Sequence, residues 1–484
     1  MSKNLNSEIK ALNPLIADPK RCTEAQVADL LKPNCRNFQQ TQNVDTSILD
    51  PTVVRNDYIR FVLDRKGILH SNSKISLSME LSGDSHKAFF PFPTGVYSLI
   101  KKCVLRAGTT ILDSCDSFNL LSAYENQMLG NDTALRKERI KTGFVNARKS
   151  QKVPSIVGRA LNGSEVASKI SYDLGRDFEL TLGTDGQAPV GDKVKTTIHE
   201  NQDLRNGSDF VMDLSTLFPS LRFTQLPLYM IDQPVIIELF LEDTNGHRIC
   251  TPSGGTLPVF NVDLDSPKLI ADYIYYDIDT MNNFASQNAT MSLPFFEHQL
   301  IRTNVNYNTN SSFVRNCGGA GKAISMIKIA HNEPDSADRH NSLINDFKSD
   351  IQETGNADDV AYNIKVNDKF LFPVKISNVC EQYVNTLEAE GLPLNLSARE
   401  YQDSLGTDFT NVELIEEHEQ PASFNGQKRF MSIFNLTGER VNNRGLELHL
   451  DVANGADKSI LQNVWLQISK TLVLSSGRFT EVYN

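Results

Sequence analysis

The sequence predicts an all-β protein made of two consecutive sandwich bodies, and three observations predict it. Apolar residues alternate with polar ones along several segments, which places every second side chain on one face of a strand. Turn-forming dipeptides such as Asn162-Gly163 and Asn454-Gly455 separate these segments. Helical patterns are few and short. This combination is typical of antiparallel sandwiches or barrels and not of alternating strand and helix units.

The length and charge of the chain narrow its class further. The 484 residues are 40% hydrophobic and 22% charged, and about 100–200 residues per domain predict more than one folded unit. The formal net charge of −11 repels a phosphate backbone, so we expect no sequence-specific binding to nucleic acid. The polar N-terminus lacks the apolar core of a secretory signal, and no apolar run would span a bilayer. We expect synthesis in the cytosol and seven reduced cysteines.

The clearest strand covers residues 74–81, where Ile75, Leu77 and Met79 alternate with polar residues. Such alternation predicts a strand with one buried face. The same pattern recurs at residues 235–241, 274–278, 446–452 and 464–468.

The best helix follows Asp116 or Ser117, either of which suits a helix start, and Gly130 suits its end. Phe118, Leu121, Tyr124 and Met128 form its apolar stripe. Further short helices are predicted at residues 24–32, 213–218, 341–347 and 380–391.

A weak internal repeat divides the β-rich part of the chain. Residues 97–129 read as a strand, a turn and a short helix, and residues 322–347 repeat that order. We place the boundary within residues 254–268, which predicts an N-terminal arm (1–50), a first body (51–255) and a second body (256–484). About 210 residues per body suits eight strands with long loops. The longest irregular stretches, near 130–175 and 331–360, are expected to project or to carry function.

The Gly-rich residues 318–322 (GGAGK) resemble a phosphate-binding loop only superficially. That motif needs Gly where Asn316 stands and Ser or Thr where Ala323 stands. We expect a turn before a strand. A second candidate is a group of His and acidic residues, for which a hydrated acidic loop is the favoured interpretation because the spacing fits no common metal site: His331, Glu333, Asp335, Asp338 and His340.

No serine lies in a G-x-S-x-G motif and no cysteine lies in a recognisable catalytic signature. We therefore predict no catalytic residues, no cofactor, no metal and no enzyme activity. His449 alternates with Leu448 and Leu450 and is predicted to face away from the core, on a surface or interface. The cationic segment 136–152 is expected to be a solvated loop or a contact with an acidic neighbouring subunit, and four aromatic residues are expected to pack internally: Trp465, Phe89, Phe90 and Phe92.

Three segments resemble the double jelly-roll major capsid proteins of polinton-like viruses, virophages and related eukaryotic DNA viruses. They are FPFPTGVYSLIKKCVLRAGTTILD, DLSTLFPSLRFTQLPLYMIDQPVIIELFLED and NVWLQISKTLVLSSGRFTEV. The resemblance covers most of residues 50–484 and is a pattern of strands and short helices without an active-site motif.

The resemblance implies two eight-stranded antiparallel jelly rolls side by side in one chain. Three chains would form a pseudo-hexagonal homotrimeric capsomer that tiles the icosahedral shell of a double-stranded DNA virus. Expected partners are the chain itself, penton proteins and minor capsid proteins, and the expected location is the virion, after assembly in the host cytoplasm or nucleus. The arm would reach a neighbour, and no maturation cleavage is expected beyond the last strand.

Two other classes remain open from the sequence. Jelly rolls also serve as carbohydrate-binding or receptor-attachment modules, which exposed aromatic residues lining one sheet would favour. A hydrolase would need Ser, His and Asp side chains converging in a pocket.

Overall fold

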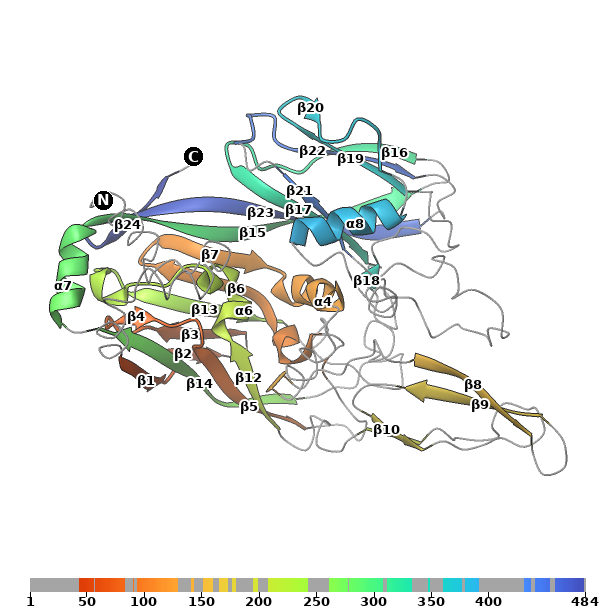
Figure 1. Cartoon of the computed structure of the whole chain (residues 1–484), viewed down its shortest axis with the longest axis horizontal. Coiled ribbons are helices and arrows are strands. Elements are labelled where there is room, and N and C mark those ends of the chain that lie inside the picture. Colours follow the sequence, from red (N-terminus) through yellow and green to blue (C-terminus); the bar gives the residue numbers. More distant parts are fainter. Residues whose placement is uncertain are drawn as a thin grey trace, which may run out of the picture.

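The structure is a computed structural model of the chain. The residues it describes lie in these ranges: 43–55, 57–82, 90, 94–128, 141–142, 151–159, 165–172, 176–179, 195–198, 208–242, 261–276, 278–307, 311–332, 347–348, 360–376, 379–390, 431–436, 440–452 and 458–482. The described residues are mostly strands with a few short helices, so the all-β prediction is confirmed (Figure 1).

A small sheet forms the outer layer of the first half, in the order β1-β14-β5-β12 with β4 attached to β14. Its strands are β1 (Asn43–Leu49), β14 (Asn261–Tyr275), β5 (Lys74–Ser82), β12 (Ser208–Asp213) and β4 (Ile68–Leu69). In β5, Ile75, Leu77 and Met79 are buried as their alternation predicts.

One eleven-stranded sheet runs through both halves, in the order β18-β17-β23-β15-β7-β6-β13-β3-β2, with β21 on β17 and β24 on β23. The first half supplies β2 (Val53–Arg55), β3 (Tyr58–Val62), β6 (Ile100–Ala107), β7 (Thr110–Asp116) and β13 (Val235–Leu241). The second half supplies β15 (Thr290–Tyr307), β17 (Ala323–Asn332), β18 (Phe347–Lys348), β21 (Ser432–Asn435), β23 (Lys458–Ser475) and β24 (Arg478–Val482).

A second small sheet covers the other end of the large one (Figure 1). Its order is β16-β22-β19-β20, with β16 (Ser311–Asn316), β22 (Glu447–Val452), β19 (Val360–Val366) and β20 (Lys369–Phe370). Two separate strand pairs are β8 (Gln151–Arg159) with β9 (Glu165–Tyr172), and β10 (Arg176–Glu179) with β11 (Lys195–Ile198).

Strands β15 and β23 connect the two cores. They pair without a break from Thr290 opposite Ser475 to Tyr307 opposite Lys458. At one end of this ribbon, Phe295 and Leu472 belong to the core of the first half. Near the middle of the ribbon, on the same face, Leu466 belongs to the core of the second half. The two sandwiches therefore share strands and form one block.

The halves join where β7 lies parallel to β15, with Glu297 opposite Ser114 and His298 opposite Cys115. The Nε1–H of Trp465 on β23 donates a hydrogen bond of 3.0 Å to the Asp116 carbonyl of β7. Trp465 is fully buried, which confirms its predicted packing role. We call this contact between β7, β15 and β23 the junction.

Helix α4 (Phe118–Met128), helix α6 (Leu214–Leu217) and helix α8 (Val379–Glu390) confirm three of the predicted helices. Helix α6 ends before Pro219, which begins the 3-10 helix η5 (Pro219–Arg222). The helix predicted at 24–32 lies outside the described residues, as does the one at 341–347 except for Phe347, which is in β18. Two more 3-10 turns are η1 (Gly95–Leu99) and η6 (Leu228–Met230). No helix among the described residues is long and apolar enough to cross a membrane.

The strand pairing crosses two of the boundaries expected from the sequence, and the division of the chain into an arm and two bodies stays a prediction. β14 hydrogen-bonds to β1, β4 and β5 of the first half, although the division at 255/256 assigns its residues to the second body. The first sheet therefore extends to Tyr275. β1 lies within the expected arm (1–50), yet it pairs along its whole length with β14. Residues 1–42 lie outside the described residues.

Other local expectations were wrong for identifiable reasons. The stretch after β6 was expected to be a turn, but it forms strand β7, whose interior holds the polar residues Asp113 and Ser114. The alternation at 274–278 ends at Tyr275, and Ile278 begins helix α7 (Ile278–Gln287). Ile278 is 74% exposed, so its place in the pattern does not reflect burial.

Candidate assembly surfaces

The outer face of the sheet β16-β22-β19-β20 combines apolar and charged side chains. Along β22, Leu448 and Leu450 point into the core, so Glu447, His449 and Asp451 point outward. His449 thus faces away from the core, as predicted, and its ring packs edge-on against Phe370 at 5.0 Å. Three large apolar side chains near this face are exposed by more than half: Val314, Phe370 and Val374.

Ion pairs neutralise the charges on this face. Lys365 Nζ lies 3.3 Å from Glu447 Oε2, and this contact lowers the pKa of the Glu447 carboxyl. Lys375 pairs with Asp451, which also accepts a 2.6 Å hydrogen bond from Ser312 Oγ. Because each carboxylate has a cation beside it, the face presents apolar groups without an excess of either charge.

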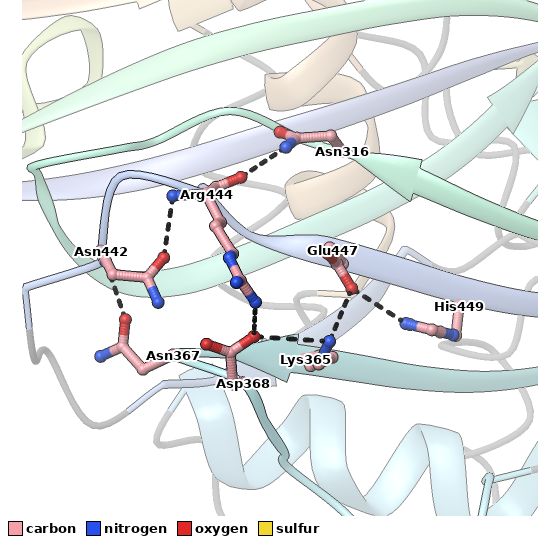
Figure 2. A network of polar contacts seen from close by, with 8 residues as sticks. All are labelled: Asn316, Lys365, Asn367, Asp368, Asn442, Arg444, Glu447 and His449. Atoms are coloured by element: carbon pink, nitrogen blue, oxygen red, sulfur yellow. Dashed lines mark hydrogen bonds and ion pairs between the residues drawn. The ribbon is translucent and has the colours of Figure 1, made fainter.

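Figure 2 shows how the loops at the end of this sheet are tied together. Asn367 and Asp368 have positive φ angles of 50° and 64° and form the turn between β19 and β20. Asn367 Oδ1 accepts a 2.8 Å hydrogen bond from the Asn442 amide, and Asp368 Oδ1 accepts one of 2.8 Å from Arg444 Nη1. The Asn316 side chain donates to the Arg444 carbonyl. This network, which we call the loop network, holds three chain segments in one arrangement.

The first half exposes different groups. β1 is an edge strand of its sheet, and Val44 and Ile48 on it are 57% and 64% exposed. An exposed strand edge with apolar side chains can accept another chain. Residues 43–49 therefore form a second candidate contact surface.

The large sheet also carries a partly buried ion pair, between Arg106 of β6 and Glu238 of β13. Arg106 donates two hydrogen bonds to Glu238, of 3.0 Å from Nε and 2.9 Å from Nη2, and Tyr58 O–H donates a third of 2.7 Å. The Arg106 hydrogen bond lowers the pKa of Glu238, whereas burial and the Glu238 contact raise the pKa of Tyr58 to about 12. Phe240 packs on Tyr58 at 5.1 Å.

The predicted turn at residues 318–322 is confirmed. Gly318, Gly319 and Gly321 have positive φ angles, and β17 begins at Ala323. A Cβ on Gly319 would lie 2.3 Å from Ile324 Cδ1, so this position needs glycine for space as well as for φ.

The described part of the chain contains only some of the other residues discussed in the sequence analysis. Phe90 is buried, whereas Phe89 and Phe92 lie outside the described residues. Of the His and acidic group, His331 lies in β17 and the others are outside. Within the described residues no cluster of three metal-ligating side chains occurs. Most of segment 136–152 is also outside, but Lys141 pairs with Asp213 of the same chain.

Comparison with solved structures identifies the fold. No protein-family model and no curated protein matches the chain. VP54 of PBCV-1, fitted into a cryo-EM reconstruction of the virophage Sputnik, matches with a TM-score of 0.53 and 11% identity over 92% of this chain and 97% of that one. The quasi-atomic model of the PBCV-1 virus capsid matches with a TM-score of 0.51 and 11% identity over 92% of this chain and 97% of that one. The cryo-EM structure of the Sputnik virophage matches with a TM-score of 0.51 and 10% identity over 92% of this chain and 89% of that one.

These matches extend over both halves of the chain, so the architecture as a whole is shared. The chain has the double jelly-roll fold of viral capsid proteins, as the resemblance implied. The expected eight strands per jelly roll stay a prediction. At identities of 10–11% the similarity defines the fold and leaves the function to be argued from the surfaces.

A carbohydrate-binding or receptor-attachment module would be favoured by exposed aromatic residues lining one sheet. The described part of the chain does not gather such residues on one sheet. Its exposed aromatic residues are Phe223, which follows η5, Phe240 on β13 and Phe370 on β20, so they lie apart in the sheets. Both candidate contact surfaces were missed as surfaces by sequence reasoning. His449 was the one signal, because its alternation with leucines predicts an outward side chain.

Proposed function

We propose that this chain is a major capsid protein, three copies of which form a pseudo-hexagonal capsomer in the icosahedral shell of a double-stranded DNA virus. The observation that carries the proposal is the match in fold to capsid structures over 92% of this chain. In this role the chain acts by association and catalyses no reaction.

The block formed by the two sandwiches suits such a role. Because β15 and β23 lie in both cores, the two jelly rolls keep a fixed relative position. Two similar bodies in a fixed arrangement, repeated three times, approximate sixfold symmetry. Subunit association would then gain its free energy from apolar surface buried between copies.

We place contacts between copies at the two surfaces described above. The surface of Val314, Phe370 and Val374 in the second half is apolar and charge-balanced, and edge strand β1 in the first half exposes Val44 and Ile48. A first half of one copy against a second half of the next is a head-to-tail contact that closes into a ring with three copies. Penton and minor capsid proteins are further proposed partners, and the virion is the proposed location.

Electron microscopy of the purified protein, combined with mass measurement in solution, tests the proposal. We expect six-lobed particles with about three times the 54.1 kDa mass of one chain, or closed shells. Monomers that show no assembly across a range of concentration and salt would overturn the capsid role.

Surface variants test where the copies meet. Val374→Asp and Ile48→Asp each place a charge on an exposed position, so each should leave the fold intact and reduce the trimer fraction. Phe223→Ser is a matched control, since it changes a 44% exposed apolar residue on neither surface. Trimers unchanged in both variants would exclude these surfaces without touching the proposed function itself.

A further inference from the structure

The junction contains a buried acidic residue with no cation of its own. Asp113 on β7 is completely buried. Its Oδ2 accepts a 3.2 Å hydrogen bond from the Ser220 amide of η5, whereas its Oδ1 is buried with no hydrogen-bond partner. A buried carboxylate with an unsatisfied oxygen is costly, and the usual response of such a group is to take up a proton.

The charges around Asp113 do not balance when it is ionised. Lys470 on β23 and Glu297 on β15 form a buried ion pair beside it, with side chains 6% and 20% exposed. Both act electrostatically on Asp113, Lys470 by attraction and Glu297 by repulsion. Two carboxylates thus share one ammonium group, and the cluster is neutral only when one carboxyl is protonated.

The other charged groups near the junction have partners elsewhere. Asp116 on β7 pairs with Lys102 of β6 at 2.8 Å. Glu125 of α4 pairs with Lys328 of β17 at 2.7 Å. His298, next to Glu297 on β15, lies opposite Cys115 and therefore on the same sheet face as Asp113, but it is not among the groups whose charges mainly act on Asp113. The remaining titratable neighbours are the thiols of Cys103 and Cys115, and burial raises the pKa of both well above the ordinary value, which keeps them neutral.

We propose that Asp113 is a proton-binding switch of the junction: its protonated form lets β7, η5 and the β15–β23 ribbon pack together, and its ionised form weakens that contact. Burial is the main cause that raises the pKa of Asp113, to about 7 from 3.8, and the Ser220 hydrogen bonds oppose it. The switch therefore acts near neutral pH.

The sign of the effect follows from linkage. When the junction opens and Asp113 meets water, its pKa returns toward the ordinary value of 3.8. Between about pH 4 and pH 7 the closed form holds a proton that the open form does not, so the opening constant rises by up to about tenfold per pH unit. Above pH 7 both forms are ionised and this contribution becomes constant.

Hydrogen–deuterium exchange of the full-length protein tests the switch, with rates corrected for the pH dependence of intrinsic exchange. Peptides covering β7 and β15 are compared between the wild type and Asp113→Asn, which keeps the shape and removes the charge. We expect the ratio of wild-type to variant opening constants to rise by more than about tenfold from pH 5 to pH 7 and then to level off. Asp232→Asn, an exposed acid paired with Arg65, is the control and should show a constant ratio.

Ser220→Ala provides a second test if Asp113→Asn fails to fold. It keeps the Ser220 amide but removes the Ser220 hydroxyl, whose hydrogen bond to Asp113 also lowers the pKa of that carboxyl, so the pH at which the opening constant levels off should move upward. A wild-type to Asp113→Asn ratio that does not change between pH 5 and pH 8, or an unshifted profile in Ser220→Ala, would overturn the proposal. Both outcomes are independent of whether the chain assembles into capsomers.

Discussion

Ion pairs occur both at the junction and in the loop network, but they lie in opposite surroundings. The Lys470 side chain is 6% exposed and its partner Glu297 is 20% exposed. Arg444 in the loop network is 72% exposed and its partner Asp368 is 50% exposed. An exposed pair gains little because water screens both charges, whereas a buried charge that loses its partner is left without solvation.

Ion pairs have different roles in the loop network and at the junction. In the loop network, ion pairs and amide hydrogen bonds fix the shape of loops whose residues would otherwise be solvated. At the junction, the charged groups make the packing of two cores depend on protonation and pairing. Shape at the outer face should therefore tolerate the loss of one pair, and the junction should not.

The largest expected effect is that of Lys470→Met. The substitution leaves Glu297 and Asp113 buried without a cation, so we expect a loss of about 3–5 kcal/mol in the free energy of unfolding. Chemical denaturation followed by tryptophan fluorescence suits the measurement, because Trp465 lies at the junction.

The double variant Glu297→Gln with Lys470→Met is the control for this prediction. Removing both charges restores neutrality, so most of the lost stability should return. A double variant as unstable as Lys470→Met would mean that packing, and not charge, determines the effect.

Leu466→Ala and Val314→Ala extend the comparison to apolar side chains. Leu466 is fully buried between β23 and the second small sheet, whereas Val314 on β16 is 63% exposed. We expect Leu466→Ala to cost about 2–5 kcal/mol because it leaves a cavity, and Val314→Ala to change stability by less than about 0.5 kcal/mol. Thermal melts of the two variants measure this, and similar losses would contradict the assigned burial.

Glu238→Gln tests an acid whose pH effect is opposite to that of Asp113. Arg106 lowers the pKa of Glu238 below 4.5, so its contribution is present above that pH and is lost as the pH falls through the lowered value. At pH 7 we expect Glu238→Gln to cost about 1.5–3 kcal/mol, since hydrogen bonds to a charged group are lost. The difference from wild type should shrink in acid, and one that grows as the pH falls would contradict this assignment.

The smallest effect is expected for Arg444→Ala. The exposed pair with Asp368 should contribute less than about 1 kcal/mol, and added salt should reduce the difference further. Melts at low and high ionic strength check both statements. A loss as large as that of Lys470→Met would remove the distinction between the two regions.

The sequence allowed the fold class to be predicted where burial follows a simple period. The alternation of apolar and polar residues predicted β5 and β13, and the capping residues predicted α4. It failed at β7, because Asp113 and Ser114 occupy the interior of a buried strand and break the apolar pattern. Nor does it indicate that β14 pairs with β1 and β5, since that pairing is a long-range choice that local composition does not encode.

The contact surfaces and the junction were even less accessible to sequence reasoning. Val314 and Phe370 lie on strands of one sheet that are more than 50 residues apart along the chain, and only the register places them on one face. Asp113 carries no sequence signal, because its properties come from Ser220, Glu297 and Lys470 on three other elements.

The pairing of β15 with β23 has a consequence for how the chain folds as it is made. β15 ends at Tyr307, but the strand that pairs with it begins at Lys458. During synthesis the second sandwich therefore waits for about 150 further residues, at roughly 5–20 residues per second, with one edge of β15 uncovered. Closing so long a loop is slow, and an open apolar edge invites pairing with another nascent chain. Chaperone protection of this interval would set the yield of native protein.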